Sequence, residues 1–492
     1  MLQIKIIFLT LVCSLVPVSQ VNAAGSIWYN DGDPLSTGLD LPPVLFRTDL
    51  NVTDSKSAVP DTSCGNIDYS QPLSLTAVTE AALCNNPQTR ESYANAKVQA
   101  AQLGIAKSAF LPVLNDNLTV SESYVDPKSA SRGRDYYNLS NSLAASYLLY
   151  DFGNRDATLE NARQLLQAVS ATQSVVVQNL LLAAIKAYYQ VQTDIALLDA
   201  TKESESFNLE SFKSAEAKYK AGVSTPADKL QAETAYAQAV LTRITAEGTL
   251  KTDYGVLANV MGLNANAPLK LIDTKNTPAN TGEIEHDINQ LIEYARIRRP
   301  DLVASEAQVN AAKASIEASR AAAKPTVSIN LSNSLLDGSN LNSSNNSTLG
   351  LTVSVPLFAG YAPTYRIRSA EAAAEAKEAQ RDQLKLQISL DVWTAFQNLR
   401  TAHETIKSAD VLVNSAKESA RVALGRYKAG VGNIIDTLNA QSALASANQQ
   451  KIKADLSRNI ARATLAQSIG TLDSVMIQSL PDGVKETTEA KP

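Results

Sequence analysis

Four segments of the chain alternate between apolar and polar residues with a period of two. The segments TVSINLSNSLL and TLGLTVSVPL lie within residues 326–357, and two similar runs lie within residues 113–150. Such alternation predicts strands with one apolar and one polar face. We therefore expect a β-hairpin in each range, with the first strand of the earlier hairpin weakened by Asp116 and Glu122. The residues DGSNLNSSNNS, rich in turn formers, predict the loop of the later hairpin.

The polar face of these strands consists almost wholly of uncharged Ser, Thr and Asn. A soluble sheet packed against a core gives the same alternation and is the alternative. The uncharged polar face and a strand length of about 10 residues favour a strand between lipid and a watery lumen. Four strands are too few to close a barrel, for which about eight are needed. Because lipid does not tolerate an open sheet edge, several chains must then share one barrel.

Two long stretches have a helical composition. From Asn154 to Lys220 no proline or glycine interrupts 67 residues, and the stretch from Pro363 to Lys428 is nearly as long. At 1.5 Å per residue the first stretch would span about 100 Å. A purely structural coiled coil would explain these helices, but not the strands. The apolar residues of the first stretch recur at coiled-coil spacing: Leu165, Val169, Val176, Leu180, Ala183 and Ala187.

The chain contains two copies of one plan. The phrases KYKAGVSTPADKLQAETAYAQA from Lys218 and RYKAGVGNIIDTLNAQSALASA from Arg426 start 208 residues apart and agree at 11 of 22 positions. Each copy is expected to run through a helix, a variable polar segment, a long helix, the Lys-Ala-Gly-Val turn and a returning helix. A period this long indicates gene duplication rather than a solenoid. Prolines that fit the start and end of a helix are 25 residues apart in both copies: Pro87 and Pro112, Pro300 and Pro325.

The N-terminus has the pattern of a secretory signal. Lys5 precedes an apolar run of about 13 residues, and Val21 and Ala23 are small residues suited to cleavage before Ala24. A membrane anchor is the alternative, but the run is too short to span a bilayer easily. No other run in the sequence is predicted to form a transmembrane helix. A lipoprotein is not expected, because Cys13 lies inside the apolar run.

These patterns divide the chain into a leader, a flexible segment, two repeats and a tail. The helical hairpin of each repeat turns at a tip, near residues 221–226 in the first repeat and 429–434 in the second. The predicted ranges are residues 1–23 for the signal peptide, 24–72 for the flexible segment, 73–272 for the first repeat, 285–472 for the second repeat and 473–492 for the tail.

Composition excludes several classes of function. The net charge of −5 is spread along 492 residues without a block of like charges, so nucleic-acid binding is not expected. There are only two histidines, no metal-ligand cluster and no glycine-rich phosphate loop, so we predict neither an enzyme nor a cofactor. Removal of the leader leaves Cys64 and Cys84, and an exported chain with two cysteines is expected to join them. Two unpaired thiols are the alternative.

Each half of the chain carries a further motif after its second strand, YDFGNR in the first half and PLFAGY in the second. Together with the paired YKAGV turns and the helix–hairpin–helix plan, these motifs resemble the TolC family of outer membrane channels. The resemblance covers roughly Leu73 to Leu472. It implies a mainly α fold with β, in which a homotrimer forms a 12-stranded barrel in outer membrane lipid and a long periplasmic α-helical tunnel. It also implies two partners, a periplasmic adaptor and an inner-membrane ABC or proton-driven transporter.

The resemblance places the periplasmic entrance at the two tips. Gly222 and Gly430 suit the ends of the long helices. Asp436 matches an acidic position that lines the family's entrance, where three copies would form a ring of carboxylates. Asn439 is the next ring position, at which the family's best-known member has a second aspartate. The residues expected to dock the adaptor are Ala221, Gly222, Val223, Ala429, Gly430 and Val431.

The resemblance also implies a latch at the tips. Tyr427 and Asp228 match a hydrogen-bonded pair that keeps the entrance closed. Gly432 stands where the family has an arginine that strengthens this latch, so we expect a weaker latch here. The alternative for Asp228 and Asp436 is a simple interaction of their charges with helix N-termini.

The cargo is not determined by the resemblance, because the family serves both drug efflux and one-step protein secretion. The pair Cys64 and Cys84, with no lipid anchor, favours type I protein secretion over multidrug efflux. A structural periplasmic coiled coil or adaptor is the alternative from another class, and it would lack the four strands. A soluble periplasmic enzyme would need a catalytic constellation that the sequence does not contain.

Overall fold

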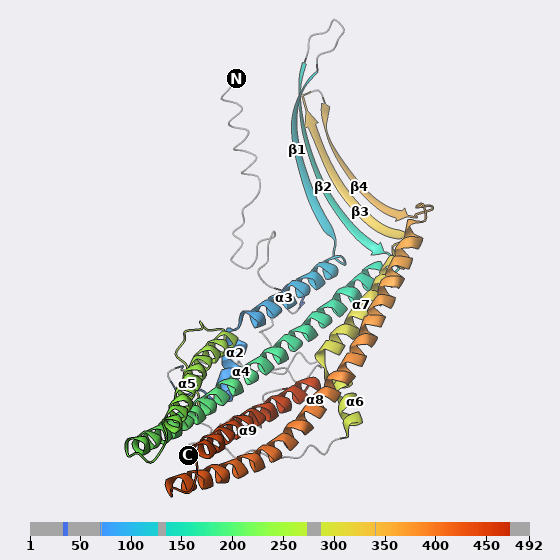
Figure 1. Ribbon diagram of the computed structural model, residues 1–492. Helices are drawn as coiled ribbons and strands as arrows, with labels where there is room; N and C mark the ends of the chain where they lie inside the picture. Colours follow the sequence, from blue (N-terminus) through green and yellow to red (C-terminus); the bar gives the residue numbers. More distant parts are fainter. Residues whose placement is uncertain are drawn as a thin grey trace, which may run out of the picture. The chain divides into compact units, whose positions relative to one another are not determined.

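The computed structural model describes residues 33–37, 69, 71–125, 134–272, 287–339 and 341–472 (Figure 1). The predicted signal peptide, Cys64 and the predicted tail lie outside these residues. The chain divides into two compact units. Among the described residues, the strand unit contains residues 33–37, 97–125, 134–163, 317–339 and 341–367. The helical unit contains residues 69, 71–96, 164–272, 287–316 and 368–472.

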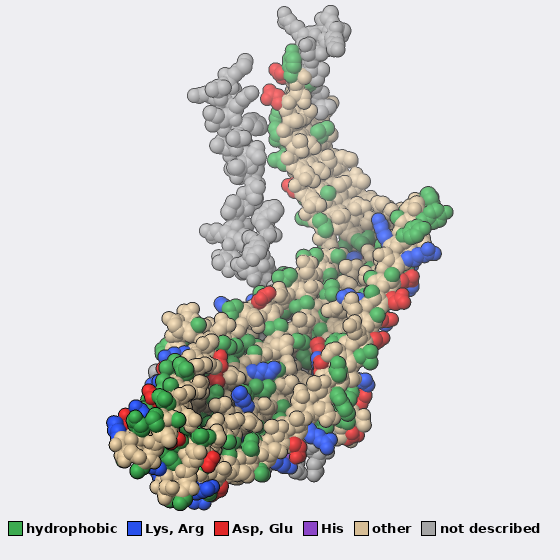
Figure 2. Space-filling model, viewed as in Figure 1, with side chains coloured by type: hydrophobic (Ala, Val, Ile, Leu, Met, Phe, Trp, Pro, Cys, Tyr) green, Lys and Arg blue, Asp and Glu red, His purple; other side chains and the backbone are tan. Residues whose placement is uncertain are grey.

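The strand unit contains one antiparallel sheet in the order β1-β2-β3-β4 (Figure 1). Its strands lie where the alternation predicts them, and within the described residues β1 and β4 each pair on one side only. The visible face of the sheet carries few charged side chains (Figure 2). The strands are β1 (Val113–Val125), β2 (Arg134–Tyr150), β3 (Thr326–Gly338) and β4 (Leu341–Ser354).

The long loop predicted between β3 and β4 is wrong in its extent. The strands continue through most of DGSNLNSSNNS, since β3 runs to Gly338 and β4 begins at Leu341. Asparagine side chains pair across the two strands, as Asn333 Nδ2 donates to Asn345 Oδ1 and Ser347 Oγ, both at 2.8 Å. Such cross-strand pairs stabilise the extended ladder, so turn-forming residues are accommodated within strands.

The helices show the duplication in their lengths. Each repeat has helices of 11, 22, 67 and 35 residues in the same order. The first repeat contains α2 (Leu75–Asn85), α3 (Pro87–Ser108), α4 (Asn154–Lys220) and α5 (Pro226–Val260), and the second contains α6 (Ile288–Arg298), α7 (Pro300–Ala321), α8 (Ala362–Lys428) and α9 (Ile434–Ser468).

The main hydrophobic core forms around α4. Among the described residues α4 is one helix long and apolar enough to cross a membrane, with a mean hydropathy of 1.5 over 18 residues. The expectation that no such run follows the leader is therefore wrong. In the structure Leu181, Ile185 and Tyr188 of this helix are buried against α2, α5 and α9. Burial among other helices accounts for part of the apolar composition, since 39% of the 18-residue window is buried.

A short turn of the N-terminal segment is held on α3. Lys107 Nζ donates to the carbonyls of Leu35 and Ser36, at 2.6 and 2.9 Å. Thr37 is buried, and its backbone N–H donates to Asp33 Oδ2 at 2.6 Å. The segment predicted to be flexible therefore contains an anchored turn at residues 33–37.

Candidate functional site

The two tips have the same backbone turn. Gly222 and Gly430 adopt positive φ angles of 73° and 78°, which glycine tolerates without strain. In each turn the following valine closes a hydrogen bond to the residue five positions earlier, which caps the end of the long helix. These bonds run from Val223 N–H to Lys218 O and from Val431 N–H to Arg426 O, both at 3.0 Å.

The predicted docking residues lie at the surface of the tips. Val223 and Val431 are 73% and 70% exposed. Ala221, Gly222, Ala429 and Gly430 are exposed beside them.

The return helices begin with different caps. Thr225 and Asp228 form a capping box at the start of α5, with Asp228 N–H donating to Thr225 Oγ1 at 3.2 Å and Thr225 N–H donating to Asp228 Oδ2 at 3.1 Å. At the start of α9, Asn433 Oδ1 accepts from Ile435 N–H at 2.8 Å. The carboxylate of Asp228 is thus used within its own turn.

A small hydrophobic cluster joins the two tips. Ala215 and Ala232 come from the first repeat, and Tyr427 and Ile434 from the second, with all four buried. Tyr427 is 6% exposed at the end of α8. Contacts between the repeats therefore hold the tips of one chain together.

Tyr427 and Asp228 lie near each other but are not hydrogen-bonded. The Tyr427 hydroxyl is buried and has no hydrogen-bond partner in the described part of the chain. Burial raises the pKa of Tyr427, and the charge of Asp228 adds to this rise. The nearby Ser214 side chain lowers the pKa of Tyr427 and so offsets part of this rise. The Ser214 and Tyr427 hydroxyls do not meet the geometry of a hydrogen bond.

Lys218 contacts Tyr427 directly, although the sequence did not single out this lysine as a site residue. Lys218 Nζ donates to the Tyr427 carbonyl at 2.9 Å and lies 3.6 Å from the centre of its ring. The only signal in the sequence was the position of Lys218 in the repeated phrase, where it matches Arg426. A second link between α4 and α8, from Lys428 to Glu210 at 3.4 Å, is exposed and contributes little.

Asp436 and Asn439 share one side of α9. Both are exposed and line a groove of about 640 Å³ together with Glu418, Arg426 and Gly432. A side chain at Gly432 would place its Cβ 2.9 Å from Tyr427 N and 3.0 Å from the Arg426 carbonyl carbon. The arginine that the family has at this position therefore does not fit the turn seen here.

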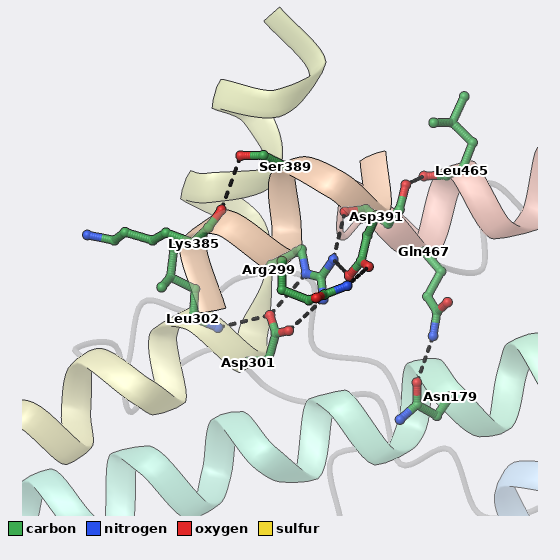
Figure 3. Close-up of polar contacts among 11 residues, drawn as sticks. Asn179, Arg299, Asp301, Leu302, Lys385, Ser389, Asp391, Leu465 and Gln467 are labelled. Carbon is green, nitrogen blue, oxygen red and sulfur yellow. Dashed lines mark hydrogen bonds and ion pairs between the residues drawn. The ribbon is translucent and has the colours of Figure 1, made fainter. Parts of the chain in front are cut away.

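A second polar cluster, also missed from the sequence, lies in the helical unit (Figure 3). Arg299 is 15% exposed and pairs with Asp301 at 2.6 Å and with Asp391 at 2.9 Å. Burial lowers the pKa of Arg299, but the bonds to the two carboxylates outweigh it and raise the pKa overall. Nearby, Gln467 Nε2 donates to Asn179 Oδ1 at 2.6 Å, which links α9 to α4 (Figure 3).

The described residues contain no group of three or more His, Cys, Asp or Glu side chains that could hold a metal ion. Cys84 is disulfide-bonded. The other two cysteines, Cys13 and Cys64, lie outside the described residues. The pairing of Cys84 with Cys64 stays a prediction.

The chain is similar to known bacterial proteins over most of its length. Protein CyaE of Bordetella pertussis is 29% identical over 385 residues, which cover 77% of this chain and 80% of that protein. Outer membrane protein TolC of Vibrio cholerae is 24% identical over 414 residues, which cover 82% and 91%.

The fold and the family agree. The crystal structure of CusC matches with a TM-score of 0.73 at 19% identity, covering 87% of this chain and 97% of that one. The sequence profile of the family described as outer membrane efflux protein matches residues 78–263 and 291–471. The predicted fold of the chain is confirmed, with long helices and four strands. The chain belongs to the outer membrane efflux protein family and lies in the outer membrane, with a large periplasmic part.

Proposed function

We propose that this protein is the exit duct of an export system that spans the periplasm and the outer membrane. Three copies form the duct, and a periplasmic adaptor connects it to an inner-membrane transporter that supplies the energy. The observation that carries this proposal is a four-stranded sheet on a chain with two 67-residue helices. Within the described residues, the outer edges of β1 and β4 have no partner strand. Such a sheet needs further copies to close in lipid.

The tips are the proposed entrance and docking surface. Val223 and Val431 expose apolar side chains on matching turns, which suits contact with a partner protein. Asp436 lies in an open groove beside them. Three copies of Asp436 around the axis would favour cations and disfavour anions.

We propose type I protein secretion as the route, in line with a disulfide-bonded Cys84 and a predicted signal without a lipid-bearing cysteine. Multidrug efflux is the second candidate, and membership of the outer membrane efflux protein family favours it. The two routes differ in cargo and in the partner transporter.

A deletion strain compared with its parent distinguishes the routes. Secreted proteins and tolerance to dyes, detergents and antibiotics are scored side by side, with the full chain restored as a control. Loss of one large secreted protein with unchanged tolerance supports protein secretion. New sensitivity with an unchanged set of secreted proteins supports efflux and contradicts secretion. No change in either contradicts the export function.

A further inference from the structure

Lys218 bridges the two repeats at the tip. Its ammonium group donates to the carbonyl of Tyr427 at 2.9 Å and lies over the Tyr427 ring at 3.6 Å. We propose that Lys218 is the latch that keeps the entrance closed, by binding the end of α8 from the end of α4. The inference rests on the proposed function of the tips as the entrance.

The chemistry of both partners favours this contact. Tyr427 lies in the last turn of α8, where the helix dipole places partial negative charge on the carbonyls. Its carbonyl accepts a second hydrogen bond from Gly430 N–H at 3.2 Å, so the lysine binds a carbonyl already held in the turn. The face of the ring is also negative and attracts an ammonium group. Lys218 is half-buried, so water screens the contact less than an exposed ion pair.

The expected latch residue, Asp228, is occupied elsewhere. Its carboxylate accepts from Thr225 N–H at 3.1 Å within the capping box. The Tyr427 hydroxyl has no hydrogen-bond partner among the described residues. The parts of Tyr427 that act in the latch are therefore its ring and its carbonyl, and the hydroxyl is dispensable.

The matching basic residue of the second repeat does not take this role. Arg426 occupies the position equivalent to Lys218, but it is exposed and lines the groove that contains Asp436. One basic residue of the duplicated phrase thus closes the tip, and the other faces the groove.

Single-channel recording of purified trimers in planar lipid bilayers tests the latch. Lys218→Met keeps the length of the side chain and removes its charge, and we expect the open probability to rise about tenfold. Lys218→Arg retains a cation and stays within about twofold of the wild type. Tyr427→Phe keeps the ring and carbonyl and leaves the open probability unchanged. Lys220→Met, two residues away on the exposed end of α4, is the matched control.

A second measurement gives the separation of the two tips and does not depend on ion conduction. Trimers in which one chain carries spin labels at Val223→Cys and Val431→Cys, and the other two chains carry none, report the distance between the two turns of one chain. Lys218→Met in all three chains should widen this distance, whereas Lys220→Met should not. Wider tips in trimers that never conduct support the latch and contradict the proposed duct. Unchanged distances and unchanged open probability in Lys218→Met overturn the latch. Opening by Tyr427→Phe instead assigns the latch to the hydroxyl and also overturns the inference.

Discussion

The two repeats close the same helix junction with different chemistry. In the first repeat, between α2 and α3, Asn86 Oδ1 accepts from Gln88 N–H at 2.9 Å and Asn86 Nδ2 donates to the Val260 carbonyl at 3.0 Å. In the second repeat, between α6 and α7, the equivalent residue is Arg299, which pairs with two carboxylates. One junction is held by uncharged hydrogen bonds and the other by partly buried ion pairs.

The difference between uncharged and charged contacts goes with the size of the hydrophobic cluster next to each junction. The first junction adjoins the large cluster that contains Leu83, Leu181 and Tyr188. The second adjoins a smaller cluster of five buried residues, among them Leu302 and Ile388. An ion pair taken out of water adds little net stability, because desolvation of the charges offsets their attraction. We infer that the charges fix the geometry of the junction where less apolar surface is available to do so.

The largest expected effect comes from the glycines that face the two junctions. Gly262 and Gly470 both have positive φ, but a Cβ on Gly262 would lie 2.6 Å from the Asn85 carbonyl carbon, whereas one on Gly470 would lie 3.1 Å from that of Arg298. Gly262→Ala should lower the free energy of unfolding by about 3 kcal/mol or more, and Gly470→Ala by about 2 kcal/mol.

Chemical unfolding of purified trimers measures both values. Gly222→Ala is the control, because it has positive φ and open space around the added Cβ. It should cost only about 1 kcal/mol. If all three variants lose the same free energy of unfolding, the loss comes from backbone strain alone, and the close packing at the junctions contributes nothing further.

Removal of the charge at the second junction should have the next largest effect. Arg299→Met leaves Asp301 and Asp391 without their shared cation, and we expect a loss of about 2–4 kcal/mol in the free energy of unfolding. Asn86→Ala, at the first junction, should cost about 1 kcal/mol as the loss of a helix cap. Unfolding by denaturant compares the two, and a larger loss for Asn86→Ala would contradict the contrast.

The helical hairpins of the two repeats also differ, because the first contains a pair of facing aspartates that the second lacks. Asp194 in α4 is 4% exposed and faces Asp253 in α5, whereas the equivalent residues of the second repeat are Ala402 and Ala461. Burial first, and then the hydrogen bond with Asp253, raise the pKa of Asp194 to about 7, against 3.8 in the unfolded chain.

The folded state therefore binds a proton more tightly than the unfolded state, and stability falls as the pH rises from about 4 to 7. We expect the free energy of unfolding to drop on the order of 2 kcal/mol between pH 5 and pH 8 through this group. Asp194→Ala, which installs the residue of the second repeat, should flatten this part of the profile. A profile that is unchanged in the variant would assign the pH dependence to other groups.

The smallest expected effect separates two equivalent aspartates at the tips. Asp228 is used in a capping box, whereas Asp436 lines the open groove. Asp436→Asn should lower the cation-to-anion permeability ratio about threefold, and Asn439→Asp should raise it. Asp228→Asn is the matched control and should leave the ratio unchanged. Reversal potentials in a salt gradient give these ratios, and an equal effect of both asparagine variants would contradict the assignment of Asp436 to the entrance.

Local patterns in the sequence predicted the elements of the fold. Alternation placed the four strands, and the uninterrupted stretch from Asn154 to Lys220 coincides with α4. The error at DGSNLNSSNNS arose because Asn and Ser favour turns in isolation, whereas here Asn333 and Asn345 pair across strands. The apolar stretch of α4 was missed as a candidate span because its apolar residues are interrupted by polar ones.

The contacts of the candidate site could not be predicted in the same way. Lys218 and Tyr427 are 209 residues apart, and their contact depends on how two helical hairpins pack. The pairing of Arg299 with Asp391 also joins separate helices, 92 residues apart. A single sequence shows that such residues are present, but neither periodicity nor composition reports which of them meet.

The most direct test of the account is a recording from wild-type trimers reconstituted in a planar lipid bilayer under a potassium chloride gradient. An export duct with a ring of Asp436 predicts discrete conductance steps and a reversal potential on the cation-selective side. The account would be contradicted if trimers insert into the bilayer but show no conductance steps, both in the wild type and in Lys218→Met, which should open the tips.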